Sequence, residues 1–436
     1  MDDTIFALAT APGRAGLAIM RVSGRRAGDC VKALTGKEIP AERQAVLRDF
    51  HGPGGERIDR GLVLWFAAPR SLTGDDVVEF QIHGGRAVAE AMAMALGRIS
   101  GCRPAEPGEF TRRAVLSGKL DLTQAEAVAD LVDAETGAQH RQALRQYDGA
   151  LGALCHGWRA GLVRALAWAE AVIDFSDEEL GGDPLAEARR TAEQVLQAID
   201  GHLNDGRRGE LVRDGLFLTV IGPPNAGKSS LVNALAGRDV AIVSETAGTT
   251  RDVIEVRLDL GGYAVILADT AGLREAANSV EAEGVRRALA RAQQADLVLV
   301  LVDGSDENAP ANPAEELVGR PALTVWNKAD LPWPLPREGL RLSLKTGEGL
   351  DGLIADLTTA ARERLEQGDG PALTRPRHRY ALQEAAEALR RAHEAHRSEL
   401  FAEDLRLALR ALGRLTGHVD VEELLDAIFR DFCIGK

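Results

Sequence analysis

Gly222-Pro-Pro-Asn-Ala-Gly-Lys-Ser229 is the stretch that decides how the middle of this chain folds. It follows a short apolar run, Leu216 to Ile221, and precedes a run with helical apolar spacing. A strand, a glycine-rich turn and a helix in that order are the context of a phosphate-binding loop. The glycines let successive backbone N–H groups face phosphate oxygens, while Lys228 supplies a cation and Ser229 an oxygen for Mg²⁺. The sequence therefore predicts a nucleotide-binding domain.

Four short apolar runs indicate the sheet of this domain. They lie at Leu216 to Ile221, Val265 to Ala268, Leu297 to Val302 and Leu323 to Trp326, and helical stretches separate them. Strands that alternate with helices are typical of a parallel sheet with crossover helices. We therefore expect an α/β P-loop domain over residues 212–366.

Three motifs near the ends of these strands indicate the rest of a nucleotide site. Asp269-Thr-Ala-Gly272 would place a carboxylate near Mg²⁺ and a glycine N–H near the γ-phosphate. In Asn327-Lys-Ala-Asp330, the last carboxylate can accept two hydrogen bonds from the guanine edge, which adenine cannot supply. Ser343-Leu-Lys345 is expected to contact the base through its backbone. The predicted nucleotide is GTP, and these motifs resemble those of the Ras-like GTPase superfamily.

The residue that orients the attacking water is less easily assigned. Leu273 follows Gly272, where Ras-type enzymes carry a glutamine, and leucine has no polar atom. The local candidates are Arg274, Glu275, Glu281 and Glu283, each of which is otherwise an exposed solvated charge. Thr250, in the loop Gly248-Thr-Thr-Arg-Asp252, is expected to complete the Mg²⁺ shell.

The 436 residues are too many for one typical hydrophobic core, so two or three domains are expected. Residues 1–118 mix β-rich runs (Gly16 to Val22, Gly61 to Ala67 and Asp76 to His83) with one Ala-rich helix, Arg86 to Ile99, which predicts an α+β domain. Residues 119–211 and 367–436 both carry helical apolar spacing, and Thr123 with Glu126 predicts a capping box.

Because insertion is tolerated where chain ends lie close together, we expect one discontinuous all-α domain, built from both helical flanks, with the G domain inserted between them. The expected architecture is thus multidomain, with an N-terminal α+β domain, the helical domain and the α/β P-loop domain. A separate C-terminal bundle is the alternative.

Charge and composition restrict the functions that this chain can have. Lys and Arg number 52 against 66 Asp and Glu, for a net charge of -14, which is opposite to the basic footprint of an autonomous nucleic-acid binder. Apolar runs fall far short of the roughly 20 residues that a membrane span needs. The acidic start Met-Asp-Asp-Thr is unlike a secretion signal, so we expect a cytoplasmic protein with four reduced cysteines and no CxxC pair.

Further motifs give a closer resemblance that spans essentially the whole chain. Beside the P-loop form and Asp269-Thr-Ala-Gly-Leu-Arg-Glu275, they are Thr10-Ala-Pro-Gly-Arg-Ala-Gly-Leu-Ala-Ile-Met-Arg-Val-Ser-Gly24, Gly108-Glu-Phe-Thr-Arg-Arg113, Lys119-Leu-Asp-Leu122 and Phe432-Cys-Ile-Gly-Lys436. Together they resemble the MnmE family, also called TrmE, of tRNA-modifying GTPases.

The resemblance implies a homodimeric GTPase that acts on tRNA. With MnmG, an FAD-dependent partner, it would form a heterotetramer that adds a carboxymethylaminomethyl-type group to carbon 5 of wobble uridine. The one-carbon unit would come from 5-formyltetrahydrofolate, in a pocket lined by Arg21, Glu79, Lys119 and Lys436. Arg and Lys could pair with folate carboxylates, and Glu79 with pterin donors.

The resemblance also implies a potassium ion in place of an arginine finger, since a cation between the β- and γ-phosphates neutralises the same developing charge. Its ligands would be Asn225, Ser244, Thr246 and Thr249, with Ser229 and Thr250 on magnesium and Glu281 as the catalytic residue. The GTP-binding residues would be Asn225, Ala226, Gly227, Lys228, Ser229, Ser230, Ser244, Glu245, Thr246, Ala247, Gly248, Thr249, Thr250, Asp269, Thr270, Ala271, Gly272, Asn327, Lys328, Asp330, Ser343 and Lys345.

Several alternatives stay open at this point. A regulatory GTP switch, such as a ribosome-assembly factor, would share the GTPase motifs, as would a GTP-binding scaffold without useful hydrolysis. Cys433 is either a nucleophile or a thiol that packs beside Phe432. The basic cluster Arg375, Arg377, His378 and Arg379 either helps to hold tRNA or belongs to a solvated linker.

Overall fold

The computed structural model describes residues 3–175, 183–242, 255–268, 295–309, 321–334, 339–366, 370–417, 419, 422–430 and 432–435. The chain divides into two compact units. The first comprises Met1–Ala129, Tyr147–Ala192 and Glu387–Lys436, and the second comprises Asp130–Gln146 and Glu193–Ala386. Each unit is therefore assembled from segments that are far apart in the sequence.

The N-terminal part of the first unit is built on a six-stranded sheet of order β3-β4-β5-β2-β1-β6. Its strands are β1 (Thr4–Leu8), β2 (Ala15–Ser23), β3 (Val46–His51), β4 (Arg57–Phe66), β5 (Val77–Gly84) and β6 (Cys102–Pro104). Neighbouring strands are antiparallel except β1 and β6. The predicted strands and the helix α2 (Arg86–Gly97) are confirmed, whereas α1 (Ala27–Thr35) was not predicted.

The two faces of this sheet have different roles, because successive side chains of a strand point to opposite sides. Met20, Val63 and Phe80 are buried and share one core with Met92 and Leu96 of α2. Arg21 and Glu79 are each next in sequence to one of these core residues, and they are paired across β2 and β5. Both therefore lie on the face opposite α2.

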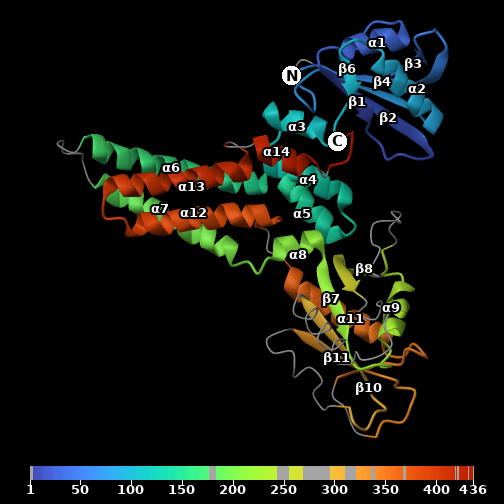
Figure 1. Ribbon diagram of the computed structural model, residues 1–436, viewed down its shortest axis with the longest axis vertical. Helices are drawn as coiled ribbons and strands as arrows, with labels where there is room; N and C mark the ends of the chain where they lie inside the picture. Colours follow the sequence, from blue (N-terminus) through green and yellow to red (C-terminus); the bar gives the residue numbers. More distant parts are fainter. Residues whose placement is uncertain are drawn as a thin grey trace, which may run out of the picture. The chain divides into compact units, whose positions relative to one another are not determined.

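The helical part of the first unit draws on both sides of the P-loop domain. Its helices are α3 (Glu109–Leu116), most of α4 (Leu122–Asp133), α6 (Ala150–Asp174), the first part of α7 (Pro184–Leu203), α13 (Ser398–Thr416) and α14 (Glu422–Phe429). Figure 1 shows α6 and α13 side by side, and Arg406 of α13 donates to Glu170 of α6 at 2.8 Å. Leu425 and Phe429 of α14 pack on Leu122 of α4. The predicted discontinuous helical domain is confirmed, and the separate C-terminal bundle is excluded.

Two local predictions in this region were wrong. The capping residue of α4 is Asp121, which accepts from the backbone N–H of Gln124 at 2.8 Å while the Gln124 side chain accepts from the N–H of Asp121 at 3.0 Å. Thr123 and Glu126 lie inside the helix and are buried. The helical apolar spacing expected over residues 119–211 is interrupted at Gly149, where φ is 87° and α6 begins after α5 (Gly137–Tyr147) has ended.

The α/β domain of the second unit has the expected sheet. Its strand order is β12-β11-β10-β7-β9-β8, with β7 (Leu216–Ile221), β8 (Glu255–Leu260), β9 (Tyr263–Ala268), β10 (Leu297–Asp303), β11 (Ala322–Asn327) and β12 (Leu340–Arg341). All neighbours are parallel except β8, which forms a hairpin with β9. The four predicted strands are confirmed, and β8 and the two-residue β12 complete the six-stranded sheet.

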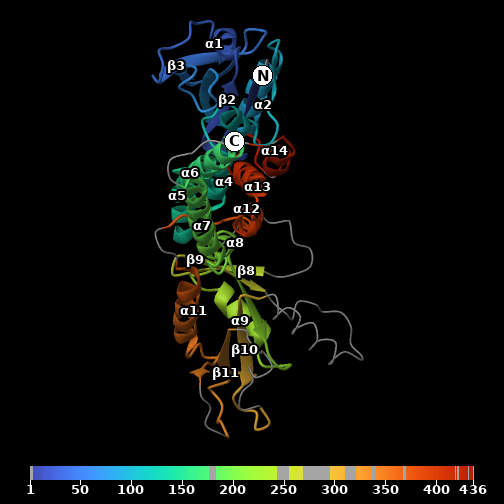
Figure 2. The same cartoon turned by 90° about the vertical axis from the view of Figure 1, so that its left-hand side faces the viewer.

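Two helices, α9 (Lys228–Ala236) and α11 (Leu350–Leu365), lie alongside these strands (Figures 1 and 2). Leu231 of α9 and Leu353 of α11 share one buried core with Leu218 of β7 and Leu299 of β10. Both helices therefore cover the same face of the sheet. Predicted nucleotide motifs begin at the ends of β7 and β11, two strands on either side of β10.

Short helices complete the second unit. They are α5, α8 (Arg208–Asp214) and the first half of α12 (Pro376–Glu394). The backbone N–H of Ala138 in α5 donates to Gly262 in the β8–β9 turn at 2.9 Å, and the amide of Gln139 donates to the Arg213 carbonyl of α8 at 2.9 Å. The segment that contains α5 thus folds with the α/β domain.

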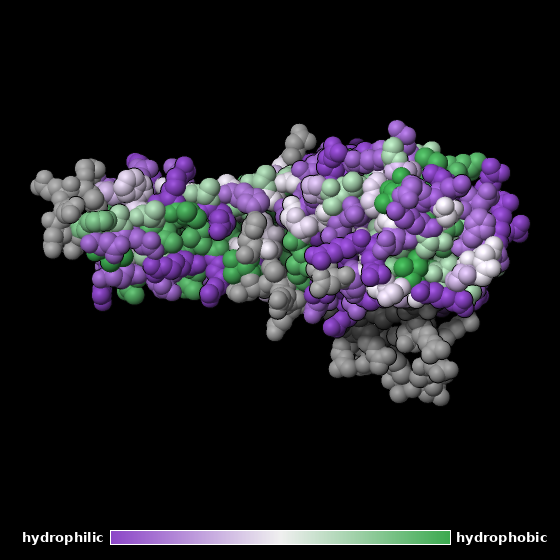
Figure 3. Space-filling model, turned by 90° about the horizontal axis from the view of Figure 1, so that it is seen from above, coloured by the Kyte–Doolittle hydropathy of each residue, from purple (hydrophilic) through white to green (hydrophobic). Residues whose placement is uncertain are grey.

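The surface is mainly polar on the face drawn in Figure 3, where hydrophobic residues form small separate groups. Among the described helices, none is both long enough and apolar enough to cross a membrane.

Candidate functional site

The loop between β7 and α9 has the backbone that its glycines allow. Gly222 has a φ of 152°, and a Cβ there would lie 2.0 Å from the carbonyl oxygen of Leu301 in β10. Gly227 has a φ of 103°, and a Cβ there would lie 2.5 Å from the amide nitrogen of Asn327. Both glycines are therefore required by close approach of neighbouring strands as well as by the turn itself.

Lys228 begins α9 directly after this loop. Its ammonium donates to the carbonyls of Gly222 at 2.9 Å and of Pro223 at 2.8 Å, so it lies across the loop. Ser229 and Ser230 follow in the first turn and are exposed. Backbone N–H groups at a helix start attract phosphate oxygens, and the lysine cation adds to that attraction. The start of α9 and the loop before it can therefore hold a polyphosphate.

Asn327, at the end of β11, connects this loop to a second one. It is buried, its amide donates to the Ala226 carbonyl at 2.7 Å, and its side-chain oxygen accepts from the backbone N–H of Leu344 at 3.2 Å. The phosphate loop, the end of β11 and the loop after β12 thus meet at one side chain. The sequence predicted that these segments belong to one site, and the structure brings them together.

Asp330 stands at the edge of this junction. Its carboxylate accepts from the Ser343 hydroxyl at 2.7 Å, and the Lys345 ammonium is 3.8 Å away. The Ser343 hydrogen bond holds the pKa of Asp330 below its usual range, and the two nearby lysines lower it further. Asp330 is therefore an ionised acceptor, which is what a guanine edge with two donors requires. Ser343 was expected to act through its backbone, and its side chain was missed.

Asp303, at the end of β10, was also missed by the sequence analysis. Its carboxylate accepts from the Lys328 ammonium at 2.5 Å and from the Ser305 hydroxyl at 2.6 Å. Burial alone would raise the pKa of Asp303, but these hydrogen bonds outweigh it and hold that pKa below its usual value. A carboxylate placed directly after an apolar strand was the available signal, because the next strand, β11, ends beside it.

Many of the predicted nucleotide and metal residues lie outside the described residues. These are Ser244, Glu245, Thr246, Ala247, Gly248, Thr249, Thr250, Asp269, Thr270, Ala271, Gly272 and Glu281. Of the proposed cation ligands, Asn225 and Ser229 are described, and both are exposed next to the loop. Their oxygens are the hard ligands that Mg²⁺ and K⁺ prefer, so the donors present fit these ions.

A second cluster of predicted site residues lies on the sheet of the first unit. The Arg21 guanidinium donates to Glu79 at 2.9 Å and to the carbonyl of Gly435 at 3.3 Å. It also lies over the Phe110 ring of α3, 5.7 Å from the ring centre. The two charges are partly buried, and the C-terminal tail joins them. The structure therefore brings Arg21, Glu79 and the tail to one place.

The tail is fixed by backbone contacts. Ile434 pairs with Pro107 as an isolated antiparallel bridge, and the carbonyl of Cys433 accepts from the N–H of Gly108 at 3.3 Å. A Cβ on Gly435 would lie 2.1 Å from the carbonyl oxygen of Leu8, so this position requires glycine. Lys436 lies outside the described residues. Lys119 is exposed and lies beside the turn at Gly74.

Three of the four cysteines differ in their exposure and surroundings. Cys433 is exposed, so its thiol lies outside the buried core, and its role as a nucleophile or as a thiol beside Phe432 stays a prediction. Cys30 and Cys102, which are distant in sequence, have their sulfurs 3.5 Å apart. Burial raises the pKa of both thiols, which keeps them protonated and poorly nucleophilic.

The basic cluster at the start of α12 is neither a linker nor an open basic surface. Arg379 donates to Glu210 at 3.0 Å and Asp205 at 2.8 Å, and Arg375 donates to Asp130 at 2.7 Å. His378 is fully buried. The expectation of a solvated linker was wrong because these side chains neutralise acidic groups inside the second unit.

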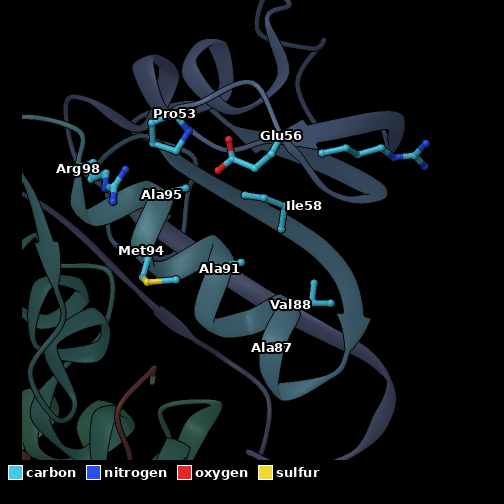
Figure 4. A pocket seen from close by; sticks show the side chains of 10 residues that line it. Pro53, Glu56, Ile58, Ala87, Val88, Ala91, Met94, Ala95 and Arg98 are labelled. Carbon is cyan, nitrogen blue, oxygen red and sulfur yellow. The ribbon is translucent and has the colours of Figure 1, made fainter.

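A separate pocket of about 310 Å³ lies between the β3–β4 hairpin and α2 (Figure 4). Its walls are mainly apolar, with Ile58, Val88 and Met94, and Glu56 and Arg98 stand at its rim. It lies beside α2, whereas Arg21 and Glu79 occupy the opposite face of the sheet. The pocket therefore does not belong to the Arg21 cluster.

Together these features define a class of multidomain protein with an inserted nucleotide-binding domain. A P-loop domain with a guanine-type acceptor is inserted into a helical domain, which follows an α+β domain that carries a charged cluster. Two family models match the chain accordingly. The N-terminal model, described as the GTP-binding protein TrmE N-terminus, covers residues 4–119, and the MnmE helical domain covers residues 122–433.

Full-length relatives agree with these models. The chain is 54% identical to a tRNA modification GTPase MnmE of Paramagnetospirillum magneticum and 56% identical to one of Parvibaculum lavamentivorans, with all of each chain covered. A third, from Rhodospirillum rubrum, is 56% identical over all of this chain and 99% of its own length. Among solved structures, the G domain of the T. maritima FeoB iron transporter is 24% identical, and the match covers 34% of this chain and 98% of that chain at a TM-score of 0.25. The chain belongs to the MnmE family.

Proposed function

We propose that this chain hydrolyses GTP to GDP and phosphate during the modification of tRNA. The observation that carries the proposal is the ionised carboxylate of Asp330, which accepts a hydrogen bond from Ser343 at 2.7 Å. The glycine loop that precedes α9 belongs to the same site, and Lys228 lies across it. Such a carboxylate accepts from the two N–H donors of guanine, and the loop accepts a polyphosphate. The name of the full-length relatives, tRNA modification GTPase, points the same way.

For hydrolysis we propose magnesium on Ser229 and Thr250, and potassium on Asn225, Ser244, Thr246 and Thr249. The two cations would neutralise charge that develops on the phosphates. Lys228 would bind the β- and γ-phosphates, and Glu281 would orient the attacking water. Replacing Glu281 with Ala should then lower kcat and leave GDP affinity unchanged. A normal kcat in that variant would remove Glu281 from the mechanism.

The finer reaction is proposed from the same family. The chain, with an MnmG-type FAD-dependent partner, would add a carboxymethylaminomethyl-type group to carbon 5 of wobble uridine. A tetrahydrofolate derivative would supply the one-carbon unit. The partly buried Arg21–Glu79 pair supports a site for it, because Arg suits a carboxylate and Glu suits N–H donors. Lys119 and Lys436 would complete this site.

We also propose that the chain is a homodimer through its N-terminal sheet. On the face opposite α2, Leu47, Leu62 and Ile19 lie in one row across β3, β4 and β2, with Gln81 of β5 between the last two. Leu47 is 54% exposed and Leu17, on the same face, is 49% exposed. An exposed apolar row of this kind suits a second copy of the same sheet. Leu47→Glu should shift the chain toward monomer in analytical ultracentrifugation, whereas Met94→Glu on α2 should not.

Guanine binding tests the main proposal most directly. Calorimetry should detect GDP binding to the full chain and much weaker ADP binding. Asp330→Asn should reverse the preference between GDP and XDP, because the amide can donate to the carbonyl that xanthine carries in place of the guanine amine. A wild-type chain that ignores GDP, or an Asn variant that keeps the GDP preference, contradicts the assigned site. Calorimetry with 5-formyltetrahydrofolate, on wild type and Arg21→Gln, tests the second site.

A further inference from the structure

Trp333 lies next to the predicted guanine site without belonging to any of its motifs. Its indole N–H donates to the carbonyl of Lys328 at 3.1 Å. The ring lies close to Gly304, where a Cβ would be only 2.4 Å from it, and the Arg341 guanidinium lies over the ring, 4.0 Å from its centre. The indole is thus in contact with both a glycine backbone and a cation.

Lys328 is the residue on which these contacts converge. It has a φ of 65°, a conformation that a residue with a side chain rarely adopts, so neighbouring contacts must hold it there. Its carbonyl accepts from the backbone N–H of Leu331 at 3.0 Å as well as from Trp333. Its ammonium is bound by Asp303 at 2.5 Å. Both ends of the residue are therefore fixed.

The local sequence makes Trp333 a stiff support. It stands in Pro332-Trp333-Pro334, and the following proline restricts the Trp333 backbone to extended conformations. Gly304 directly follows Asp303, the last residue of β10, so two adjacent residues contact the indole and bind the lysine. Neither Trp333 nor Asp303 has another assigned role in the proposed nucleotide site.

We propose that Trp333 and Asp303 are positioning residues for guanine recognition. They hold Lys328 from its carbonyl and its ammonium, and so fix the turn 328–330 that presents the Asp330 carboxylate. This inference rests on the proposed GTP site and deepens it, because neither residue needs to touch the nucleotide. Their effect falls on the contacts to the guanine edge and not on those to the phosphates.

Nucleotide pairs that differ at the base edge test this role. IDP lacks the guanine amine, so it makes one of the two hydrogen bonds to Asp330, and the ratio of GDP to IDP affinity reports how well that carboxylate is placed. Trp333→Phe keeps the ring and removes the N–H. We expect it to weaken GDP binding by roughly 3- to 10-fold and IDP binding less, which narrows the ratio. Asp303→Asn should narrow the ratio in the same direction.

Trp168→Phe is the matched control, since Trp168 is half exposed on α6 in the other unit. It should leave both affinities unchanged. Equal losses for GDP and IDP in Trp333→Phe, or a ratio equal to that of the control, would overturn the inference while the GTP site stands. If Trp333→Phe does not fold, Asp303→Asn decides alone, and an unchanged ratio there overturns the inference. Failure of the wild-type chain to bind GDP would instead overturn the proposed function, so the two failures are distinguishable.

Discussion

The side-chain amide of Asn327 donates to the backbone carbonyl of Ala226 at 2.7 Å, which ties the end of β11 to the phosphate loop. The same side chain accepts from the N–H of Leu344 at 3.2 Å. One buried residue therefore sets the spacing between the segment that would hold the phosphates and the segments that would hold the base. A change at this residue should affect both halves of the site.

Asn327→Ala tests this relationship. It leaves the Ala226 carbonyl and the Leu344 N–H without their partner, and an unsatisfied buried group costs about 1–3 kcal/mol. GDP affinity should fall by roughly 5- to 150-fold at that cost, measured by calorimetry on the full chain. Asn308→Ala, at an exposed position in the same unit, is the control and should bind GDP like the wild type. Unchanged affinity in Asn327→Ala would mean that the two loops hold their spacing without it.

Potassium dependence tests the proposed second cation. Asn225 is exposed on the phosphate loop with a φ of 61°, a conformation that glycine also adopts readily. GTP hydrolysis should be roughly 10-fold or more faster in K⁺ than in Na⁺, since a cation at the transferring phosphate replaces an arginine finger. Asn225→Gly keeps the backbone and removes the side-chain oxygen, so it should abolish most of that difference. Equal rates in the two salts for the wild-type chain contradict the cation assignment.

Much of the fold follows from patterns within single segments. The strands β7, β10 and β11 are largely apolar runs, as expected for parallel strands buried on both faces, and a predicted motif begins at the ends of β7 and β11. β8 was missed because its alternating polar residues become a strand only through pairing with β9. The cap of α4 was misplaced by two residues because Asp121 and Thr123 can each cap a helix, and only the backbone decides between them.

The sites were predictable to the extent that motifs carry them. Asp330 and Lys228 could be named as candidates because their chemistry is local to a motif. Ser343, Asp303 and Trp333 act through contacts across 13, 25 and 5 positions of sequence, which spacing alone does not reveal. The basic cluster near Arg379 was misread for the same reason, since its acidic partners Glu210 and Asp205 lie about 170 residues earlier.

Replacing Arg379 separates a structural from an RNA-binding role. Its guanidinium binds Glu210, whose side chain is only 2% exposed, so Arg379→Gln removes one of two arginines that bind this buried carboxylate and leaves Arg207, 2.6 Å away. We expect the free energy of unfolding to fall by about 1–3 kcal/mol, while tRNA affinity stays the same. The control is Arg397→Gln at a largely exposed pair, which should change stability by less than about 1 kcal/mol. Lost tRNA affinity without lost stability would restore the RNA-binding interpretation.

Glu109 gives the first unit a pH-dependent contribution to stability. Burial alone would raise the pKa of this carboxyl, but hydrogen bonds from Arg103 and from the backbone N–H of Glu106 outweigh it and lower that pKa. A lowered pKa in the folded state means that the stabilisation is complete above the unfolded value, about 4.3, and is lost as the pH falls through the folded value.

Glu109→Gln should therefore lower the free energy of unfolding by about 1–3 kcal/mol at pH 7, and the difference from wild type should shrink as the pH falls below about 4.3. Scanning calorimetry of the full chain can follow this stability difference. It should appear in the unfolding transition whose midpoint GDP does not shift, because a ligand stabilises only the domain that binds it. Glu90→Gln removes an exposed pair with Arg86 and should leave that transition unchanged at both pH values. A Glu109→Gln difference that persists undiminished in acid would show that the side chain acts through packing and not through its charge.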